Sequence, residues 1–378
     1  MEFELNEHQR QLQDSAHRVL NQLWSFDKRR DCVRSQAWHS PALWSALGTL
    51  GAFGLLVPTA QAPEGLDGKM EDLWPVLLEN AKALSIEPLW SSAVMGSSAL
   101  ALCNSDHAAP LWSGVLQGTT VLAWAHDECA STLASPGRGV IAHRSEQGWA
   151  LTGTKSLVLH GPLAQVFVVS AQVQDRSTPS APPSLFLVSR SEPGMTARDF
   201  RLVDDTPASE LQLENVKAQP LMDPHDTQGL KQVMDTLTLR GMAALCVDML
   251  GAMEAAYELT LNYLNVRKQF GRVIGQNQAL RHRAAEMCVQ LEMCRSAAVA
   301  AVVAADRPQD AQSLREVRQA KLLVGQNARA LCESAIQCHG GIGMTEDYAV
   351  GHCLRRVHVA DHLLGHSQEQ ARLLAQMP

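Results

Sequence analysis

The sequence predicts a mainly helical α+β protein, with a small β domain between an N-terminal helical domain and a C-terminal four-helix bundle. The prolines give the first indication, because only Pro308 and Pro378 follow Pro224 among the 17 in the chain. Proline interrupts the interior of a helix, so the stretches 225–307 and 309–377 can hold long helices. The second indication is a change of pattern in the middle of the chain, where short alternating or β-branched segments replace helical periodicity.

Residues 1–118 are predicted to form the N-terminal helical domain. Asn6 precedes a segment, 8–24, whose apolar residues fall on one helical face, as in a capped amphipathic helix. Ser40 and Pro41 start another helix in the order of a cap followed by proline, and this helix ends at a glycine. Further helices are predicted over 70–84 and 91–102, with a Gly/Pro-rich loop over 59–69.

Residues 119–222 are predicted to form a small antiparallel barrel or sandwich. Their short segments are separated by turn residues, as in all-β domains. Gly153–Ser156 fits a tight hairpin turn between two of these segments. The predicted strands lie within 121–126, 139–144, 148–153, 156–161, 165–173, 183–190 and 209–216.

Residues 223–378 are predicted to form the bundle. Four long apolar segments are joined by short connections, which favours antiparallel neighbours. The predicted helices cover 236–268, 279–305, 313–338 and most of 349–376.

Composition indicates an ordinary globular protein of 378 residues, 46% hydrophobic and 19% charged. A net charge of −7 argues against nucleic acid as the main partner, because phosphate binding favours a basic face. The nine cysteines have no zinc-binding spacing, so we expect reduced thiols, a cytoplasmic protein and no metal site. The N-terminus lacks the features of a signal peptide, and the clearest apolar run, Ala297–Ala305, is too short for a membrane span.

The segment 337–370 carries the first candidate site. Gly340 and Gly341 allow a backbone turn to lie against a flat or phosphorylated group, and the Gln337 amide can donate and accept hydrogen bonds. The alternative interpretation is a helix that ends at a glycine, followed by a turn between helices.

A second candidate site is the sequence RKQFG, residues 267–271, followed by Gln278. A guanidinium at a helix end can donate two hydrogen bonds to a diphosphate, and an aromatic ring beside it can lie against a flat ring. The alternative interpretation is a surface Arg267 and a core Phe270.

Together, RKQFG and the QxxGG sequence about seventy residues later closely resemble the C-terminal domain of the acyl-CoA dehydrogenase family. The resemblance covers the whole chain, including the order of the domains and the LWSALGTLGAFGLLVP sequence near the start. It implies the acyl-CoA dehydrogenase fold, bound FAD, and oxidation of an acyl-CoA thioester to the trans-2-enoyl-CoA. In this chemistry a carboxylate removes the α-proton while the β-hydrogen leaves as hydride to the flavin.

The resemblance also implies roles for the two motifs. In family tetramers they hold the adenosine diphosphate half of a neighbouring subunit's FAD, and an electron-transfer flavoprotein accepts the electrons. The residues that take these cofactor-binding positions here are Arg267, Phe270, Gln278, Gln337, Gly340 and Gly341.

The chain departs from the family at the position of the catalytic base. The usual glutamate precedes a glycine, and that position is Leu364, followed by Gly365. Some relatives carry the base on the first bundle helix instead, about ten residues before a glycine. Counting back from Gly251 reaches Gly241, or Leu239 if the helix start is shifted by two, and neither residue is acidic.

Other groups near these positions are candidates for a displaced base. His366 is the first of them, since an imidazole has a suitable pKa. For His366 and for Asp361, Glu369 and Asp248 alike, we expect solvated or structurally paired side chains. The same expectation, of surface or core residues, applies to His282, His339, His352, His358 and His362.

The β domain departs from the family as well. The strand and loop that hold flavin and substrate correspond to residues 125–137, where Glu128 matches the family's acid but the Gly-Ser-Asp sequence is absent. Leu157 and Leu159 stand where an aromatic residue and a threonine should follow Lys155. Leucine packs against a ring but makes no hydrogen bond to it.

Our main hypothesis is therefore that the chain is the non-catalytic subunit of a heteromeric acyl-CoA dehydrogenase and completes a partner's FAD site. Bacterial heterotetramers with the same departures act on bulky CoA thioesters, including steroid-derived ones, and the resemblance implies that substrate class. One alternative is a self-sufficient homo-oligomeric dehydrogenase with His366 as its base. Another is a catalytically inactive scaffold of the same fold.

Overall fold

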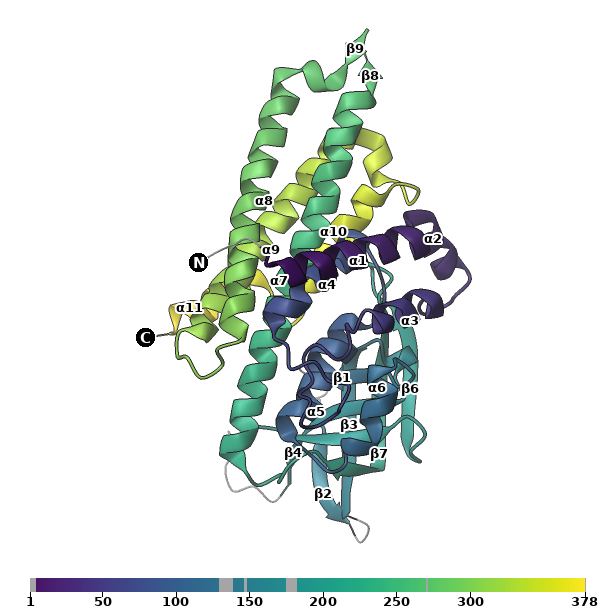
Figure 1. Cartoon of the computed structure of the whole chain (residues 1–378), viewed down its shortest axis with the longest axis vertical. Coiled ribbons are helices and arrows are strands. Elements are labelled where there is room, and N and C mark those ends of the chain that lie inside the picture. The colour runs from purple at the N-terminus through teal and green to yellow at the C-terminus, as the bar shows by residue number, and fades with distance from the viewer. Residues whose placement is uncertain (1–4, 129–138, 146–147, 175–181, 270, 378) are drawn as a thin grey trace, which may run out of the picture. The chain divides into compact units, whose positions relative to one another are not determined.

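The computed structural model describes residues 5–128, 139–145, 148–174, 182–269 and 271–377 (Figure 1). By compactness the chain divides into two units. The first, called the helical unit below, contains Met1–Arg34, Met70–Ser85 and Leu239–Pro378. The second, called the barrel unit, contains Ser35–Lys69 and Ile86–Thr238.

The N-terminal helices of the helical unit begin at local caps. Asn6 and Gln9 form a reciprocal capping box at the start of α1, with each backbone N–H donating to the other side chain at 3.1 and 2.9 Å. The carboxylate of Asp306 accepts the N–H groups of Met70 and Glu71 and so caps α4. The helices are α1 (Glu7–Leu23), α2 (Phe26–Arg34) and α4 (Met70–Lys82).

The C-terminal helices form the predicted bundle, with two differences at helix ends. The first helix begins at Thr227, earlier than predicted, because the Asp226 carboxylate accepts the Gly229 N–H at 2.9 Å and starts the helix there. The last predicted helix is two helices, because Leu364 and Gly365 have φ of +54° and +88° and interrupt it. The elements are α7 (Thr227–Val266), β8 (Lys268–Gln269), β9 (Arg272–Val273), η4 (Ile274–Gln276), α8 (Gln278–Ala305), α9 (Ser313–His339), η5 (Gly340–Met344), α10 (Ala349–His362) and α11 (Ser367–Ala375).

Helix α7 lies at the centre of the helical unit. A Cβ on Gly251 would stand 2.6 Å from the Cβ of Ala81 and 2.8 Å from the carbonyl of Leu78, so only glycine allows α4 to pack this closely. Helices α7 and α8 have the length and composition of membrane spans, but α7 is the core helix of this unit, with 83% of its apolar window buried. The apolar window of α8 is only 44% buried.

The barrel unit begins with helices and a loop. Ser40 accepts the Leu43 N–H and caps α3, as predicted, and the loop over 59–69 is confirmed. The helix predicted over 91–102 begins as a π-helix and continues as α5. The helical elements are α3 (Pro41–Thr49), η1 (Leu89–Gly96), α5 (Ser97–Cys103), η2 (Ala109–Leu111), α6 (Trp112–Leu116) and η3 (Gly161–Leu163).

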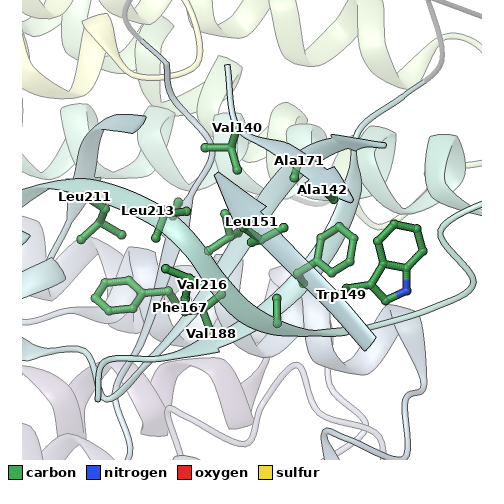
Figure 2. Close-up of a cluster of buried hydrophobic side chains, with 14 of the residues drawn as sticks. Val140, Ala142, Trp149, Leu151, Phe167, Ala171, Val188, Leu211, Leu213 and Val216 are labelled. Carbon is green, nitrogen blue, oxygen red and sulfur yellow. The ribbon is translucent and has the colours of Figure 1, made fainter. Parts of the chain in front are cut away.

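The strands of the barrel unit form a closed ring in which β4 pairs with β2, β2 with β3, β3 with β7, β7 with β5, and β5 with β4. The predicted barrel is therefore confirmed, although it is not wholly antiparallel, because β1 and β2 each pair with β4 in parallel. The strands are β1 (Leu122–Ala125), β2 (Ile141–Ser145), β3 (Gly148–Leu159), β4 (Val166–Val173), β5 (Ser184–Ser189), β6 (Met195–Arg201) and β7 (Pro207–Pro220). Their inward side chains, among them Phe167, Leu151 and Val216, fill the ring (Figure 2).

The hairpin predicted at Gly153–Ser156 is wrong. Strand β3 continues through this segment and pairs with β7 on both sides of it. Gly153 has φ of +141°, and the register with β7 shifts beside it and again after Lys155. The glycine therefore allows an irregularity within one long strand, and the chain does not reverse there.

Candidate functional site

The first part of the candidate site is the end of α7 and the start of α8, at the top of Figure 1. Arg267 directly follows α7 and is exposed, and the short β8–β9 hairpin turns the chain back. The Ile274 N–H donates to the Arg267 carbonyl at 2.9 Å, which fixes the backbone that carries the guanidinium. Gln278, the first residue of α8, is exposed too, whereas Phe270 lies outside the described residues.

The second part is the end of α9. Gln337 is exposed in the last helical turn, and Gly340 follows the helix with φ of +64° and ψ of −140°. A Cβ built on Gly340 or Gly341 would meet nothing within 4 Å. Neither glycine is required by packing within the chain, so these positions leave bare backbone that a flat or phosphorylated group can approach.

Two contacts join these parts at one end of the helical unit. The rings of Tyr263, in the last turn of α7, and His339, the last residue of α9, stack with centroids 4.6 Å apart. Arg283 of α8 lowers the pKa of Cys338 on α9 by a hydrogen bond, although burial of the thiol outweighs it and the pKa of Cys338 is raised. The predicted residues Arg267, Gln278, Gln337, Gly340 and Gly341 therefore lie on neighbouring helix ends, and we call this region the bundle tip.

The bundle tip is basic within an acidic chain. Residues 267–285 include five Arg or Lys and no Asp or Glu, whereas the net charge of the chain is −7. Helix α8 also starts there without a side-chain cap. The side chain of Asn277 is used elsewhere, because its Nδ2 donates to the Ile274 carbonyl and its Oδ1 accepts from Arg272. Uncapped N–H groups and the positive end of the helix dipole favour an anion, so the tip suits a diphosphate.

The turn between α10 and α11, where the family's base is expected, is held by hydrogen bonds from two buried side chains. Lys321, with no exposed surface, donates to the carbonyls of Ala360, Asp361 and Gly365 at 3.2, 2.7 and 3.4 Å. The Gln370 amide donates to the carbonyls of Leu364 and Gly365 at 2.9 and 3.0 Å. Leu364 is held in the left-handed region, which is uncommon for a residue with a branched side chain.

The candidates for a displaced base near this turn all have structural partners. The His366 ring accepts the Glu369 N–H through Nδ1 at 3.3 Å and caps α11. Asp361 accepts from Ser367, and Glu369 pairs with Arg372. Asp248 is held by Arg356 through two hydrogen bonds of 2.7 and 2.8 Å. Leu239, the alternative position on α7, is a buried core residue.

A group of polar side chains around the buried Lys155 lies at the end of β1 in the barrel unit. Lys155, 1% exposed, donates to the His126 carbonyl at 2.9 Å, to Glu128 at 2.6 Å and to Ser170 at 3.1 Å. Glu128 also accepts the Val140 N–H at 2.9 Å. Burial lowers the pKa of Lys155, and burial together with the Lys155 charge lowers the pKa of His126 to about 4. Glu128, the acid predicted to match the family's, is thus ion-paired with the buried Lys155, although its own side chain is 37% exposed.

The two leucines predicted to face a flavin ring follow Lys155 on β3. Leu157 is half-buried and its backbone pairs with Asp127, while Leu159 is buried. No hydrogen-bonding side chain replaces the family's threonine at Leu159. This end of the barrel unit offers a flavin only apolar packing at these two positions.

Two family models match the chain. The acyl-CoA dehydrogenase middle-domain model matches residues 123–216, and the C-terminal-domain model matches residues 227–377. The chain belongs to the acyl-CoA dehydrogenase family. Members of this family are FAD-binding oxidoreductases, so the resemblance inferred from RKQFG and QxxGG is confirmed.

Curated relatives of the acyl-CoA dehydrogenase family match at low identity. The 3-sulfinopropanoyl-CoA desulfinase of Paraburkholderia xenovorans is 25% identical over 98% of this chain and 99% of the desulfinase. Isovaleryl-CoA dehydrogenase of Pongo abelii is 26% identical over 93% of this chain and 84% of the relative. The chain spans 60% of the length of a probable acyl-CoA dehydrogenase, YngJ, of Bacillus subtilis, to which it is 28% identical.

Solved structures confirm the acyl-CoA dehydrogenase fold. A variant of the steroid ACAD Tcur3481-Tcur3483 is 26% identical with a TM-score of 0.84, over 98% of this chain and 97% of that chain. Butyryl-CoA dehydrogenase of Megasphaera elsdenii is 21% identical with a TM-score of 0.86, over 99% of both chains. A chain of the ChsE4-ChsE5 complex of Mycobacterium tuberculosis is 22% identical with a TM-score of 0.86, over 100% of this chain and 100% of that chain.

Proposed function

We propose that this chain is the non-catalytic subunit of a heteromeric FAD-dependent acyl-CoA dehydrogenase and that its bundle tip completes the FAD site of a partner subunit. One contrast carries the proposal. The groups suited to the adenosine diphosphate half of FAD are present and exposed at the bundle tip. The position of the base holds Leu364, and the nearby acids Asp248, Asp361 and Glu369 each have a partner within the chain.

The residues of the bundle tip fit the adenosine diphosphate half of FAD. The Arg267 guanidinium would donate to the diphosphate, and the uncapped start of α8 would face the same negative charge. Gln337 would donate to and accept from the adenosine, and the open backbone at Gly340 and Gly341 would let it approach. Bound FAD would accept the hydride from the acyl-CoA, while the residues of this chain would only hold and orient it.

The barrel unit does not fit a flavin ring bound by this chain itself. Glu128 forms an ion pair with Lys155 and also accepts the Val140 N–H, so its Oε1 is already engaged within the chain. Leu157 and Leu159 provide no hydrogen bond to a flavin. We therefore assign no step of the reaction to a flavin in this unit.

Exposed apolar residues support a partner chain on the helical unit. Val289 and Met293 lie one turn apart on α8 and are 60% and 48% exposed. Val266 and Met344, beside the bundle tip, are 77% and 76% exposed. Large exposed apolar side chains close together are typical of interfaces, and the low burial of α8 agrees with this.

The names of two structural neighbours support the partner and the substrate class. ChsE4-ChsE5 is a complex of two named chains, and Tcur3481-Tcur3483 is a steroid ACAD. By this similarity the partner is a second acyl-CoA dehydrogenase homologue that has the catalytic glutamate, and the substrate is a bulky, steroid-type acyl-CoA. We further propose an electron-transfer flavoprotein as acceptor and the cytoplasm as location.

The test is to purify this chain alone and together with an acyl-CoA dehydrogenase homologue from the same organism that has the catalytic glutamate. We expect the lone chain to be colourless and inactive, and the complex to be yellow and to oxidise acyl-CoA. Full turnover by the lone chain would contradict the proposal and favour the homo-oligomeric alternative. Absence of flavin from both samples would favour an inactive scaffold.

A further inference from the structure

We propose that His339 is a positioning residue that fixes the bundle tip in its FAD-binding form through ring contacts with Tyr263 and Tyr348. The inference rests on the proposed function, because it concerns how this chain holds its part of the FAD site. Each of the three rings belongs to a different segment around the tip, namely the end of α7, the end of α9 and the residue before α10.

His339 occupies the position between the two FAD-binding groups of α9. It follows Gln337 by two residues, directly precedes Gly340, and is only 3% exposed. Its Nδ1 lies 2.7 Å from the Ala335 carbonyl one turn earlier, which fixes the ring against its own helix. Burial lowers the pKa of His339 despite the nearby carbonyls of Ala335 and Leu259, so the ring is neutral at neutral pH and acts by packing.

The stack with Tyr263 joins the two motifs. The ring centroids of Tyr263 and His339 are 4.6 Å apart, with 30° between the ring planes. Tyr263 stands one helical turn before Arg267, and the Arg267 N–H donates to the Tyr263 carbonyl at 2.9 Å. A shift of either ring would therefore move the backbone of Arg267 relative to that of Gln337.

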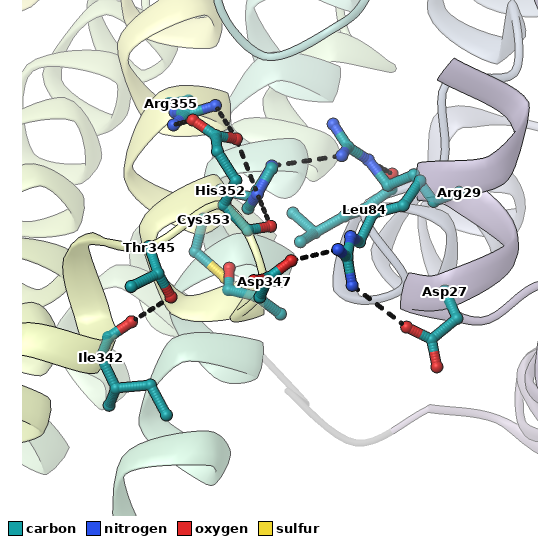
Figure 3. A network of polar contacts seen from close by, with 12 residues as sticks. Asp27, Arg29, Leu84, Ile342, Thr345, Asp347, His352, Cys353 and Arg355 are labelled. Atoms are coloured by element: carbon teal, nitrogen blue, oxygen red, sulfur yellow. Dashed lines mark hydrogen bonds and ion pairs between the residues drawn. The ribbon is translucent and has the colours of Figure 1, made fainter. Parts of the chain in front are cut away.

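Tyr348 belongs to the same ring cluster. Its ring centroid lies 5.0 Å from that of His339, with 51° between the ring planes, and 6.5 Å from that of Tyr263. The segment between Gly341 and Tyr348 is also tied down, as Figure 3 shows. Arg355 forms a salt bridge with Glu346, and Arg30 of α2 forms one with Asp347. The two open glycines thus lie between a fixed ring and a fixed loop.

Such anchoring has a direct effect on affinity. Gly340 and Gly341 make no side-chain contacts and can adopt many conformations, and ordering them on binding would cost conformational entropy. A ring fixed on three sides removes much of that freedom before FAD arrives, which is the effect of pre-organisation.

His352 provides a matched control within the helical unit. It is also 3% exposed, and its ring meets the edge of Phe26 at 4.9 Å. Its Nδ1 accepts from Arg29 at 3.2 Å, while Nε2 lies 3.2 Å from the Glu346 carbonyl (Figure 3). These contacts join His352 to Phe26, Arg29 and Glu346 rather than to the Tyr263 ring, so its loss should destabilise the unit more than it loosens the tip.

The experiment uses the complex with the catalytic homologue, stripped of FAD and titrated with FAD while flavin fluorescence is recorded. We expect His339→Ala to weaken FAD binding about tenfold, since two ring contacts are lost. His339→Phe, which retains a flat ring, should stay within about threefold of wild type. His352→Ala should lower the thermal midpoint but leave FAD binding within about threefold. If His339→Ala does not fold, His339→Leu replaces it, because leucine keeps volume without a ring face.

Arg267→Ala separates the two levels of the proposal. If it weakens FAD binding while His339→Ala leaves binding unchanged, the role of His339 is wrong and the proposed function stands. Equal weakening by His339→Ala and His352→Ala would show a general loss of stability and overturn the positioning role. If Arg267→Ala also has no effect, the proposed FAD site itself is wrong, and the role of His339 falls with it.

Discussion

The bundle tip and the turn at Leu364 lie in the same helical unit but are built in opposite ways. At the tip, Arg267 and Gln337 are exposed, and Gly340 and Gly341 face open space. At the turn, the buried Lys321 and Gln370 donate to successive carbonyls, including those of Leu364 and Gly365. The backbone carbonyls of the turn accept hydrogen bonds from side chains of the same chain, whereas the tip exposes groups that are available to a ligand.

This difference indicates which part of the family's chemistry the chain retains. The turn holds Leu364 in a left-handed conformation and has no carboxylate at this position. Its internal bonds give it a structural role. The tip presents exposed groups and open backbone, as its proposed role at a partner's cofactor requires.

The largest effect should come from the turn and should concern stability. Lys321→Met removes the buried ammonium, its hydrogen bonds to the carbonyls of Ala360, Asp361 and Gly365, and the cation beside Asp361. We expect a loss of about 3 kcal/mol in the free energy of unfolding, measured by urea denaturation. Lys231→Met, at an exposed position on α7, should change little. FAD binding by the folded complex should be unaffected. Loss of FAD from a complex that remains folded would contradict the separation of the turn's structural role from the bundle tip's role in FAD binding.

The barrel unit should respond to acid through His126. Its pKa is lowered to about 4 in the folded chain by burial and by Lys155, against 6.5 for a free histidine. Below pH 6.5 the unfolded chain takes up a proton that the folded chain does not, so stability is full above this pH and falls toward pH 4. Between pH 7 and pH 5 the loss should be about 2 kcal/mol. The His126→Gln variant should lose less stability over this interval. If the free energy of unfolding falls equally with pH in the variant and in the wild type, His126 is not the group responsible.

The bundle tip should respond in the opposite way to the turn. Arg267→Ala in the complex should weaken FAD binding about thirtyfold, because a charge-assisted pair of hydrogen bonds is lost. The free energy of unfolding should change by less than about 0.5 kcal/mol, since the side chain is exposed. Arg329→Ala, at an exposed arginine paired with Glu333 on α9, is the control and should leave FAD binding unchanged.

The smallest effect should come from the residues at the expected base position. Leu364→Ala and His366→Ala should each leave the turnover of the complex within about twofold of wild type, because in the proposed complex the partner supplies the base. His366→Ala should cost about 1 kcal/mol of stability through the lost cap of α11. A large fall in turnover with His366→Ala would instead favour a displaced base and a self-sufficient enzyme.

The parts of the fold that local sequence determines were predictable. Asn6 with Gln9, and Ser40 with Pro41, start helices where predicted, because a cap and its N–H partner lie within a few residues. Helix α2 was not predicted, since its sequence is highly charged and its buried Arg29 is satisfied by the distant Leu84 carbonyl. Such long-range partners leave no local pattern.

The same distinction explains what was missed around the candidate site. The bundle tip could be found because Arg267, Gln337 and the glycines occur in two short motifs. The break before α11 could not, because Lys321 holds that turn from another helix. The stack around His339 was missed as well, since its three rings come from separate segments and only their distances reveal it.

The central claim is that this chain supplies half of an FAD site and has none of its own. The most direct test is the ratio of FAD to polypeptide in the purified complex with the catalytic homologue, measured from flavin absorbance and quantitative amino-acid analysis. The account predicts one FAD for each pair of unlike chains, and loss of that FAD when Arg267 is replaced by alanine. One FAD for every polypeptide would contradict it, because this chain would then bind a flavin in its own barrel unit.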